Sequence, residues 1–201
     1  MTDRPTLLGI TGGIGSGKST ICIIMECLGV PVYYADERAK WLMKNDNELV
    51  CSIKNLLGKD SYSPSGDLNR SYIAKVGFGN PDILKHLNQL VHPKVSEDFD
   101  LWIDRQTATV VVKEAALLFE TGAYAALDHV WLVACPINLR VQRVLKRDPQ
   151  RTMEDVLAII DKQMKTDDAR KMASLVLENH GKNKVLGTLL KELKAIEQKI
   201  G

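Results

Sequence analysis

The stretch GGIGSGKS at residues 12–19 decides the fold of this chain. It matches the pattern G-x-x-x-x-G-K-[ST], a loop that binds the phosphates of nucleoside triphosphates. The preceding segment, Thr6–Thr11, is short, apolar and partly β-branched, as expected of a buried strand. The following residues, 20–28, have helical composition and are ended by Gly29 and Pro31. A glycine-rich loop between a strand and a helix therefore predicts a phosphate site.

The residue types of this loop suit a triphosphate with its Mg²⁺. Glycines at 12, 13, 15 and 17 let backbone N–H groups converge on an anion, and the next helix adds the positive end of its dipole. Lys18 supplies a mobile positive charge for the β- and γ-phosphates. Ser19 supplies a hydroxyl for Mg²⁺, which prefers hard oxygen ligands.

Composition bounds the class of protein. A chain of 201 residues with 45% apolar and 26% charged residues is typical of one or two globular units with a sizeable core. The net charge of +2 is too small to indicate nucleic acid or a membrane surface as the partner. Neither a secretory signal pattern nor a bilayer-length apolar run is present in the sequence, so we expect a cytoplasmic protein.

The four cysteines have apolar sequence neighbours and no CxxC spacing. We expect buried free thiols in a reducing compartment, and core packing rather than metal binding. They are Cys22, Cys27, Cys51 and Cys135.

Further along the chain, β-branched runs alternate with helical patterns, which predicts an α/β fold with a five-stranded parallel sheet. The expected strands after the first are residues 31–35, 109–113, 129–134 and 174–177. The expected helices after the first are residues 37–43, 46–58, 69–76, 80–106, 136–147, 152–164 and 182–200. Asn69 and Thr152 are expected N-caps, and Pro93 should kink or interrupt its helix.

Two helical stretches interrupt the strand pattern. Insertions at the carboxyl ends of parallel strands lie over the ligand crevice. We therefore expect a nucleotide-binding core of residues 1–36, 107–147 and 172–201, a helical acceptor domain at 37–106 and a lid at 148–171.

Asp36 ends the second expected strand, at the edge of the sheet where the glycine-rich loop lies. From there a carboxylate could orient and deprotonate a hydroxyl acceptor, or it could cap the next helix; the two interpretations are compatible. Glu114 and Glu120 flank the end of the third strand, where each could contact Mg²⁺ through water or cap a turn.

Arg140, Arg143 and Arg147 stand at i, i+3 and i+7 of one expected helix, which places them on one face. Arginines near a polyphosphate stabilise the charge of the transferring group. The alternative is a solvated basic face; for Arg140 and Arg147 we favour a functional role.

The chain resembles the dephospho-coenzyme A kinase family over nearly its whole length. The resemblance is carried by GITGGIGSGKST at 9–20, AD at 35–36, DLNR at 67–70, Leu87, HP at 92–93, LLFE at 117–120, Arg143, RD at 147–148, Gln163, Asn179 and Gly181. The chain departs from the family pattern at Tyr34, Lys40, Asn88, Ala116 and Ser174, and none of these changes removes an inferred catalytic group.

The resemblance implies a P-loop NTPase fold with a helical substrate-binding insertion and a helical lid. It also implies transfer of the γ-phosphoryl group of ATP, with Mg²⁺, to the ribose 3′-hydroxyl of dephospho-coenzyme A. Its implied catalytic residues are Asp36, Lys18 and Arg140. Its implied nucleotide contacts are Gly13, Gly15, Ser16, Gly17, Lys18, Ser19, Thr20, Arg147 and Asn179. Its implied acceptor contacts are Asp36, Lys40, Arg70 and His92.

Two rival functions share the loop. Another small-molecule kinase, such as a nucleotide kinase, would have the same loop and lid. A nucleotide-gated switch would normally carry Asn-Lys-x-Asp for guanine, whereas Asn183 and Lys184 are followed here by Val185 and Leu186. We expect a monomer or a weak homo-oligomer, with small-molecule substrates only.

Overall fold

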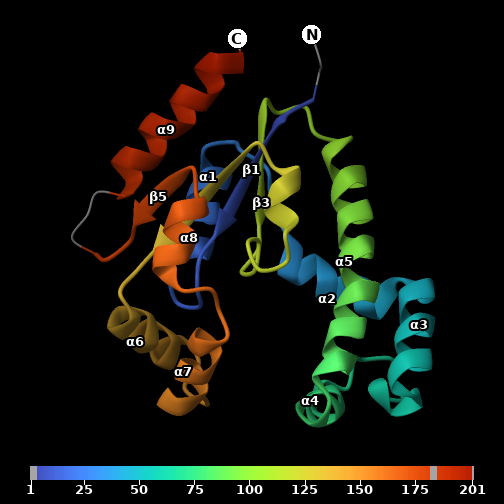
Figure 1. Ribbon diagram of the computed structural model, residues 1–201. Coiled ribbons are helices and arrows are strands. Elements are labelled where there is room, and N and C mark those ends of the chain that lie inside the picture. Colours follow the sequence, from blue (N-terminus) through green and yellow to red (C-terminus); the bar gives the residue numbers. More distant parts are fainter. Residues whose placement is uncertain (1–3, 182–184, 201) are drawn as a thin grey trace. The chain divides into compact units, whose positions relative to one another are not determined.

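The computed structural model describes residues 4–181 and 185–200. The chain divides into two compact units, one made of residues 1–33 and 106–201 and the other of residues 34–105. Figure 1 shows the elements of both. The first unit carries the sheet and the glycine-rich loop, and the second is helical.

The sheet has the strand order β2-β3-β1-β4-β5. Its central strand β1 (Thr6–Thr11) runs parallel to β3 (Val110–Glu114) on one side and to β4 (His129–Ala134) on the other. The strand β5 (Leu175–Glu178) pairs in parallel with β4, and β2 (Val32–Tyr34) lies beside β3. The predicted five-stranded parallel sheet is confirmed.

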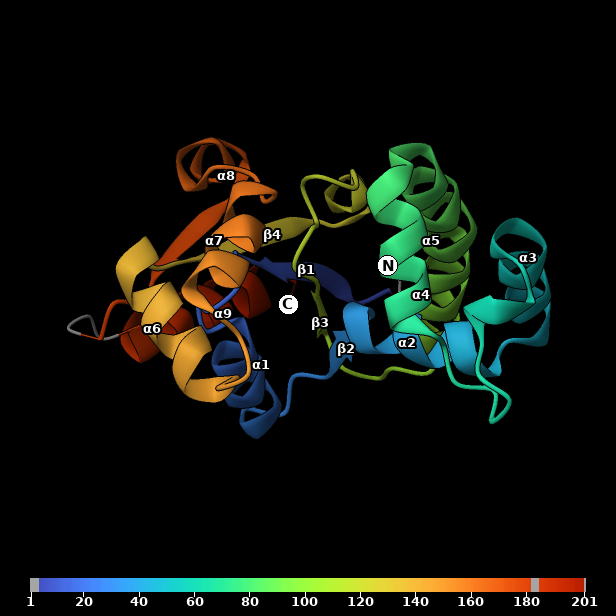
Figure 2. The same cartoon turned by 90° about the horizontal axis from the view of Figure 1, so that it is seen from below.

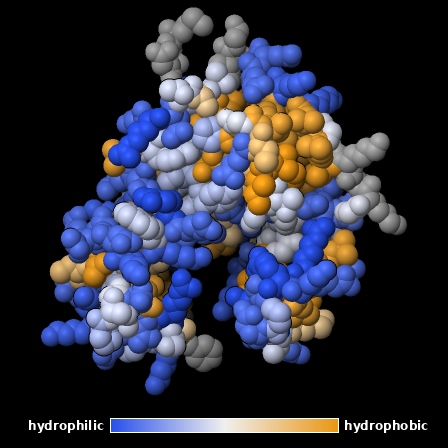
Figure 3. Space-filling model, turned by 180° about the vertical axis from the view of Figure 1, so that it is seen from behind, coloured by the Kyte–Doolittle hydropathy of each residue, from blue (hydrophilic) through white to orange (hydrophobic). Residues whose placement is uncertain are grey.

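Helices cover both faces of this sheet, which explains why its central strands are apolar along their whole length. The helices α1 (Lys18–Cys27) and α9 (Val185–Ile200) lie on one face, and α8 (Thr166–Met172) lies on the other (Figure 2). Val111 and Val112 are consequently fully buried. Hydrophobic side chains also gather on the outer surface over α1 and α9 (Figure 3).

The remaining helices of the first unit are α6 (Ile137–Arg147), α7 (Met153–Asp161) and the short 3₁₀ turn η2 (Ala123–Ala126). The predicted N-cap Thr152 is confirmed and forms a capping box with Asp155. Thr152 Oγ1 accepts from the Asp155 N–H, and the Asp155 carboxylate accepts from the Thr152 N–H. The helices α6 and α7 share an apolar cluster of Val141, Val144 and Val156, against which Ile14, Leu145, Leu157 and Ile160 pack.

The second unit is built around one long helix, α5 (Pro81–Ile103). The helices α2 (Ala35–Asn45), α3 (Asn47–Leu57) and α4 (Arg70–Gly79) each pack against it. A 3₁₀ turn, η1 (Lys59–Ser61), follows α3. The buried residues of this unit include Leu49, Ile53, Leu57, Leu87, Val91, Val95 and Phe99.

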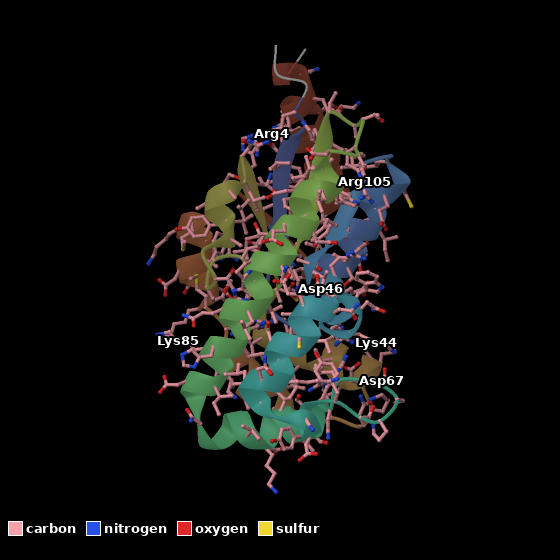
Figure 4. The ribbon with its side chains drawn as sticks, turned by 90° about the vertical axis from the view of Figure 1, so that its right-hand side faces the viewer. Arg4, Lys44, Asp46, Asp67, Lys85 and Arg105 are labelled. Carbon is pink, nitrogen blue, oxygen red and sulfur yellow. The ribbon has the colours of Figure 1, made fainter. Side chains whose placement is uncertain are left out.

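Tyrosine hydroxyls satisfy carbonyl groups near the ends of two of these helices. Tyr62 donates to the Met43 carbonyl at 2.6 Å, and Tyr72 donates to the Leu57 carbonyl at 2.9 Å. On the surface, Lys44 donates to the Asp67 carboxylate at 2.5 Å, where the two side chains lie together (Figure 4). The predicted N-cap Asn69 is confirmed by its bond from the Tyr72 N–H.

The position of Asp36 corrects the sequence-based prediction. The strand β2 ends at Tyr34, which is also the N-cap residue of α2, so Asp36 is the second residue of that helix. It is therefore neither the residue that ends the strand nor the helix cap. Its charge in the first turn is favourable to the helix dipole, as is that of its neighbour Glu37.

Three further expectations differ from the structure. Of the kink or interruption predicted at Pro93, the interruption is wrong, because α5 continues through this proline. The helix α8 was not predicted, since its sequence TDDARKM is short and mostly polar. Cys22 and Cys135 are buried free thiols as predicted, but Cys27 and Cys51 are exposed.

Among the described residues, none of the helices is both long and apolar enough for a bilayer span.

Candidate functional site

The glycine-rich loop connects β1 to α1 in a backbone shape that only glycine adopts readily. Gly17, which directly precedes α1, has φ +97° and ψ +22° in the left-handed region. Gly15 has φ +75°. A side chain at either position would be strained, because a Cβ atom disfavours positive φ.

Part of the loop's hydrogen-bonding capacity is used within the protein, and part is left for a ligand. The Ile14 N–H donates to the Gln163 Oε1 at 3.0 Å, and the Ser16 N–H donates to the Gly13 carbonyl at 3.1 Å. The N–H groups of Gly15, Gly17 and Ser19 have no partner among the residues that the structure describes. These three amides form the part of the loop that can receive an anion.

The side chain of Lys18 folds back onto the glycine-rich loop. Its Nζ donates to the Gly12 carbonyl at 2.8 Å and lies 3.8 Å from the Glu114 carboxylate at the end of β3. Both side chains are about nine-tenths buried.

Burial, with a further contribution from Glu114, raises the pKa of the nearby Cys22 thiol, so this cysteine stays protonated.

Arg140 reaches the loop from α6 and is 5% exposed. Its Nε donates to the Ile14 carbonyl at 2.8 Å, and its Nη2 donates to Gln163 Oε1 at 2.8 Å. A Cβ at Gly13 would lie 2.0 Å from this Nη2, so a glycine at that position admits the guanidinium. Burial lowers the pKa of Arg140 from its ordinary value.

Arg143 and Asn179 support the loop from its carbonyl side. Arg143 Nη1 donates to the Ser16 carbonyl at 3.3 Å, and its Nη2 donates to the Asn179 carbonyl at 3.0 Å. The Asn179 Nδ2 donates to the same Ser16 carbonyl at 2.8 Å. A Cβ at Gly17 would lie 2.1 Å from that Nδ2, a second reason for glycine there.

A pocket of about 410 Å³, counted with the solvent space at its mouth, opens beside the loop. Gly12, Ser16, Phe119, Arg140 and Gln163 are among its lining residues. The hydroxyl of Ser16 is buried there and is the one buried side-chain oxygen or nitrogen without a hydrogen bond among the described residues. A polar group left in this way is available to a ligand or to water.

Two predicted site residues that are far from the loop in sequence, Arg140 and Asn179, contact it. Lys18 and Ser19 belong to the loop and begin α1. Arg147 is placed differently. Its Nε and Nη2 each donate to the Asp148 carboxylate at 2.9 Å, and its side chain is 62% exposed. This pairing holds the pKa of Asp148 below its ordinary value.

The predicted acceptor-binding residues all belong to the second unit, and all are exposed. Asp36 and Lys40 stand one helical turn apart on α2, Arg70 begins α4, and His92 precedes Pro93 in α5. Their roles stay predictions.

The helix that carries Asp36 and Lys40 is anchored by a neighbouring arginine. Arg38 forms a two-pronged ion pair with Asp98 of α5, with its Nε at 2.8 Å and its Nη2 at 2.5 Å from the carboxylate. Its guanidinium also lies 4.4 Å from the centre of the Trp41 ring.

Sequence reasoning gave no role to two residues that hold the loop, Gln163 and Arg143. Arg143 stands three residues after Arg140, so both were expected on one helix face, and this spacing could have suggested that Arg143 also contacts the loop. Gln163 is far from the loop in sequence, and it was singled out only as one of the residues that carry the family resemblance. Glu120, left open between a metal contact and a turn cap, accepts from the Met164 N–H at 2.9 Å.

Comparison with known proteins gives a consistent result. A family model described as dephospho-CoA kinase matches residues 6–184. A dephospho-CoA kinase from Chlorobium chlorochromatii is 38% identical over 94% of this chain and 92% of its own length.

Two solved structures share the fold over nearly the whole chain. The Thermus thermophilus protein TT1252 is 36% identical, with a TM-score of 0.83 over 98% of this chain and 99% of its own. A dephospho-CoA kinase from Campylobacter jejuni is 24% identical, with a TM-score of 0.69 over 96% of this chain and 98% of its own. On the family match and the identity to a curated member, this chain belongs to the dephospho-CoA kinase family.

Proposed function

We propose that this protein transfers the γ-phosphoryl group of ATP to the ribose 3′-hydroxyl of dephospho-coenzyme A, giving coenzyme A and ADP. The chain is a member of this kinase family, and the structural observation that supports the proposal is its glycine-rich loop. Three amides, those of Gly15, Gly17 and Ser19, are left without partners beside the buried cations Lys18 and Arg140.

Binding of the triphosphate follows from these groups. The three loop amides and the N-terminus of α1 receive phosphate oxygens, and Lys18 adds a charge that can move from the Gly12 carbonyl to the phosphates. Arg140 adds a second charge from α6. Phosphoryl transfer has a loose transition state, so alignment and charge stabilisation by these groups carry most of the catalysis.

The donors present fit Mg²⁺. The Ser19 hydroxyl lies in the first turn of α1, and the Glu114 carboxylate lies beside Lys18. No group of three His, Cys, Asp or Glu side chains that could hold a metal occurs among the described residues. That suits an ion held largely by phosphates and water, which neutralises charge on the triphosphate when it is bound.

The remaining site residues take the roles that the family resemblance implies. Asp36 aligns the ribose hydroxyl and accepts its proton, while Lys40, Arg70 and His92 bind the acceptor. Gly13, Ser16, Thr20, Arg147 and Asn179 complete the nucleotide site. We assign residues 37–106 as the acceptor domain, 148–171 as the lid and the remainder as the nucleotide-binding core, in a cytoplasmic protein that is a monomer or a weak homo-oligomer.

The test is an acceptor panel in a coupled assay of ADP release. We expect turnover with dephospho-coenzyme A and none with nucleoside monophosphates or without an acceptor. ³¹P NMR of the product should show a new ribose 3′-phosphate. Turnover with a nucleoside monophosphate would favour a nucleotide kinase, and ATP hydrolysis unchanged by any acceptor would favour a nucleotide-gated switch.

A further inference from the structure

One side-chain oxygen, Oε1 of Gln163, accepts two hydrogen bonds at the glycine-rich loop. The Ile14 N–H donates to it at 3.0 Å, and Arg140 Nη2 donates to it at 2.8 Å. An amide oxygen has two lone pairs, so both are used here. Gln163 follows α7, in the segment that leads to α8.

A third bond closes this arrangement. Arg140 Nε donates to the Ile14 carbonyl at 2.8 Å, so the N–H and the carbonyl of Ile14 are both held by the two side chains. The Ile14 side chain packs against the apolar cluster of α6 and α7. The loop, α6 and the segment after α7 are therefore joined at one residue.

The closed arrangement fixes the orientation of a guanidinium group. Two of its nitrogens, Nε and Nη2, are held by acceptors on different segments, which fixes the plane of the group. The third nitrogen, Nη1, has no hydrogen-bond partner in the described part of the chain, and it would lie 2.8 Å from a Cβ at Gly13. Nη1 is thus the donor that Arg140 can offer to an anion on the loop.

We propose that Gln163 is a positioning residue that acts through Arg140. It holds the guanidinium so that Nη1 reaches the terminal phosphate of the nucleotide, and it does so before the nucleotide binds. This inference rests on the proposed kinase function, in which Arg140 stabilises the transferring phosphoryl group. Preorganised donors act at the transition state because they need no reorientation during the reaction.

The first test is the substitution Gln163→Leu, which keeps the size of the side chain and removes its acceptor. We expect kcat to fall roughly 10- to 100-fold, with the KM for dephospho-coenzyme A unchanged. Gln150→Leu is the matched control, because Gln150 lies in the same 148–171 segment, is exposed and has no hydrogen-bond partner among the described residues. It should leave kcat at the wild-type value.

Should Gln163→Leu not fold, Gln163→Asn serves in its place. Its amide is one methylene shorter and cannot reach both donors, so the same loss in kcat is expected. Circular dichroism and the Tm show which variants are folded. Wild-type kcat in a folded variant of either kind would overturn the proposal.

A double-mutant cycle separates positioning from a general effect on the fold. In an Arg140→Lys background the guanidinium is gone, so Gln163→Leu should cost little further activity. An equal fold loss in both backgrounds would mean that Gln163 does not act through Arg140, and would overturn the proposal.

Nucleotide binding gives a readout that needs no acceptor. Gln163→Leu should raise the Kd for ATP about tenfold and leave the Kd for ADP unchanged, because Nη1 is assigned to the terminal phosphate. A wild type that binds ATP but does not phosphorylate dephospho-coenzyme A would contradict the proposed function alone. Equal weakening of ATP and ADP binding would contradict the role of Gln163 alone.

Discussion

The side-chain amide of Asn179 donates a 2.8 Å hydrogen bond to the carbonyl oxygen of Ser16. The bond joins the end of β5 to the middle of the glycine-rich loop, across 163 residues of sequence. The same carbonyl also accepts from Arg143 Nη1 at 3.3 Å, so two protein donors hold it. The amides of Gly15, Gly17 and Ser19 have no partner among the described residues, as the proposed nucleotide site requires.

Replacement of this amide should loosen the loop. Asn179→Ala removes the hydrogen bond and empties the space beside Gly17, so we expect about 1 kcal/mol lower stability and a several-fold higher Kd for ATP. Asn45→Ala is the control, since Asn45 donates a similar 2.8 Å bond to the Trp41 carbonyl in the second unit. It should cost comparable stability in urea unfolding and leave ATP binding unchanged by calorimetry; equal effects of the two variants on binding would contradict this account.

Gly13→Ala tests the space that Arg140 occupies. The new Cβ would lie 2.0 Å from Nη2 and 2.4 Å from Cζ, so the guanidinium must move. We expect kcat to fall at least about tenfold, since misplacement of a catalytic group by about 1 Å costs up to a hundredfold. Gly187→Ala is the control: its Cβ meets nothing within 4 Å, and in α9 it should raise the free energy of unfolding by up to about 1 kcal/mol. An unchanged kcat in Gly13→Ala would show that the position of Arg140 is unimportant.

Asp36→Asn should lower kcat by about 10²- to 10⁴-fold and change the Kd for ATP little, because a general base acts on the acceptor hydroxyl. Glu37→Gln is a matched control, since both residues are acidic and lie in the first turn of α2. Both variants lose the same favourable charge at the helix N-terminus, so a difference in turnover between them belongs to the chemistry. Equal turnover of the two variants in the coupled assay would remove Asp36 from the mechanism.

Alkaline stability should depend on Tyr62. Burial raises the pKa of this tyrosine from 10.0 to about 12 in the folded protein. The folded state therefore holds the proton more tightly than the unfolded chain does, and the stabilisation is complete below pH 10 and is lost as the pH rises towards 12. Tyr62→Phe removes the group, so its free energy of unfolding should fall less steeply over that range than that of the wild type. Parallel slopes in urea unfolding series would contradict this.

Local sequence patterns gave the sheet, the loop and the capped helices, because each depends on residues that are close in the chain. The strand at Thr6–Thr11 and the capping box at Thr152 are examples. The hydrogen bonds that hold the loop join Ile14 to Gln163 and Ser16 to Asn179 across most of the sequence, and no periodicity reports such contacts. Asp36 was misplaced because the short strand β2 gives way at once to a helix.

Burial was harder to infer than element type. Cys27 and Cys51 have apolar neighbours in sequence but lie on the outer faces of their helices. The three arginines of α6 share one side of the helix, yet Arg147 turns to the adjacent Asp148, where a carboxylate is within reach. The exposure of the cysteines depends on how their helices pack, and the direction of the arginine side chain depends on a carboxylate just beyond the end of its helix.

The lengths of the strands bear on how the protein behaves at high concentration. The outermost strands, β2 and β5, have three and four residues, whereas β1 and β4 in the interior have six. Short edge strands offer few unpaired backbone N–H and C=O groups to a strand of another molecule, which disfavours the edge-to-edge pairing that leads to aggregates. Association between copies would then depend on side chains of the helices, and single substitutions there would be enough to change it.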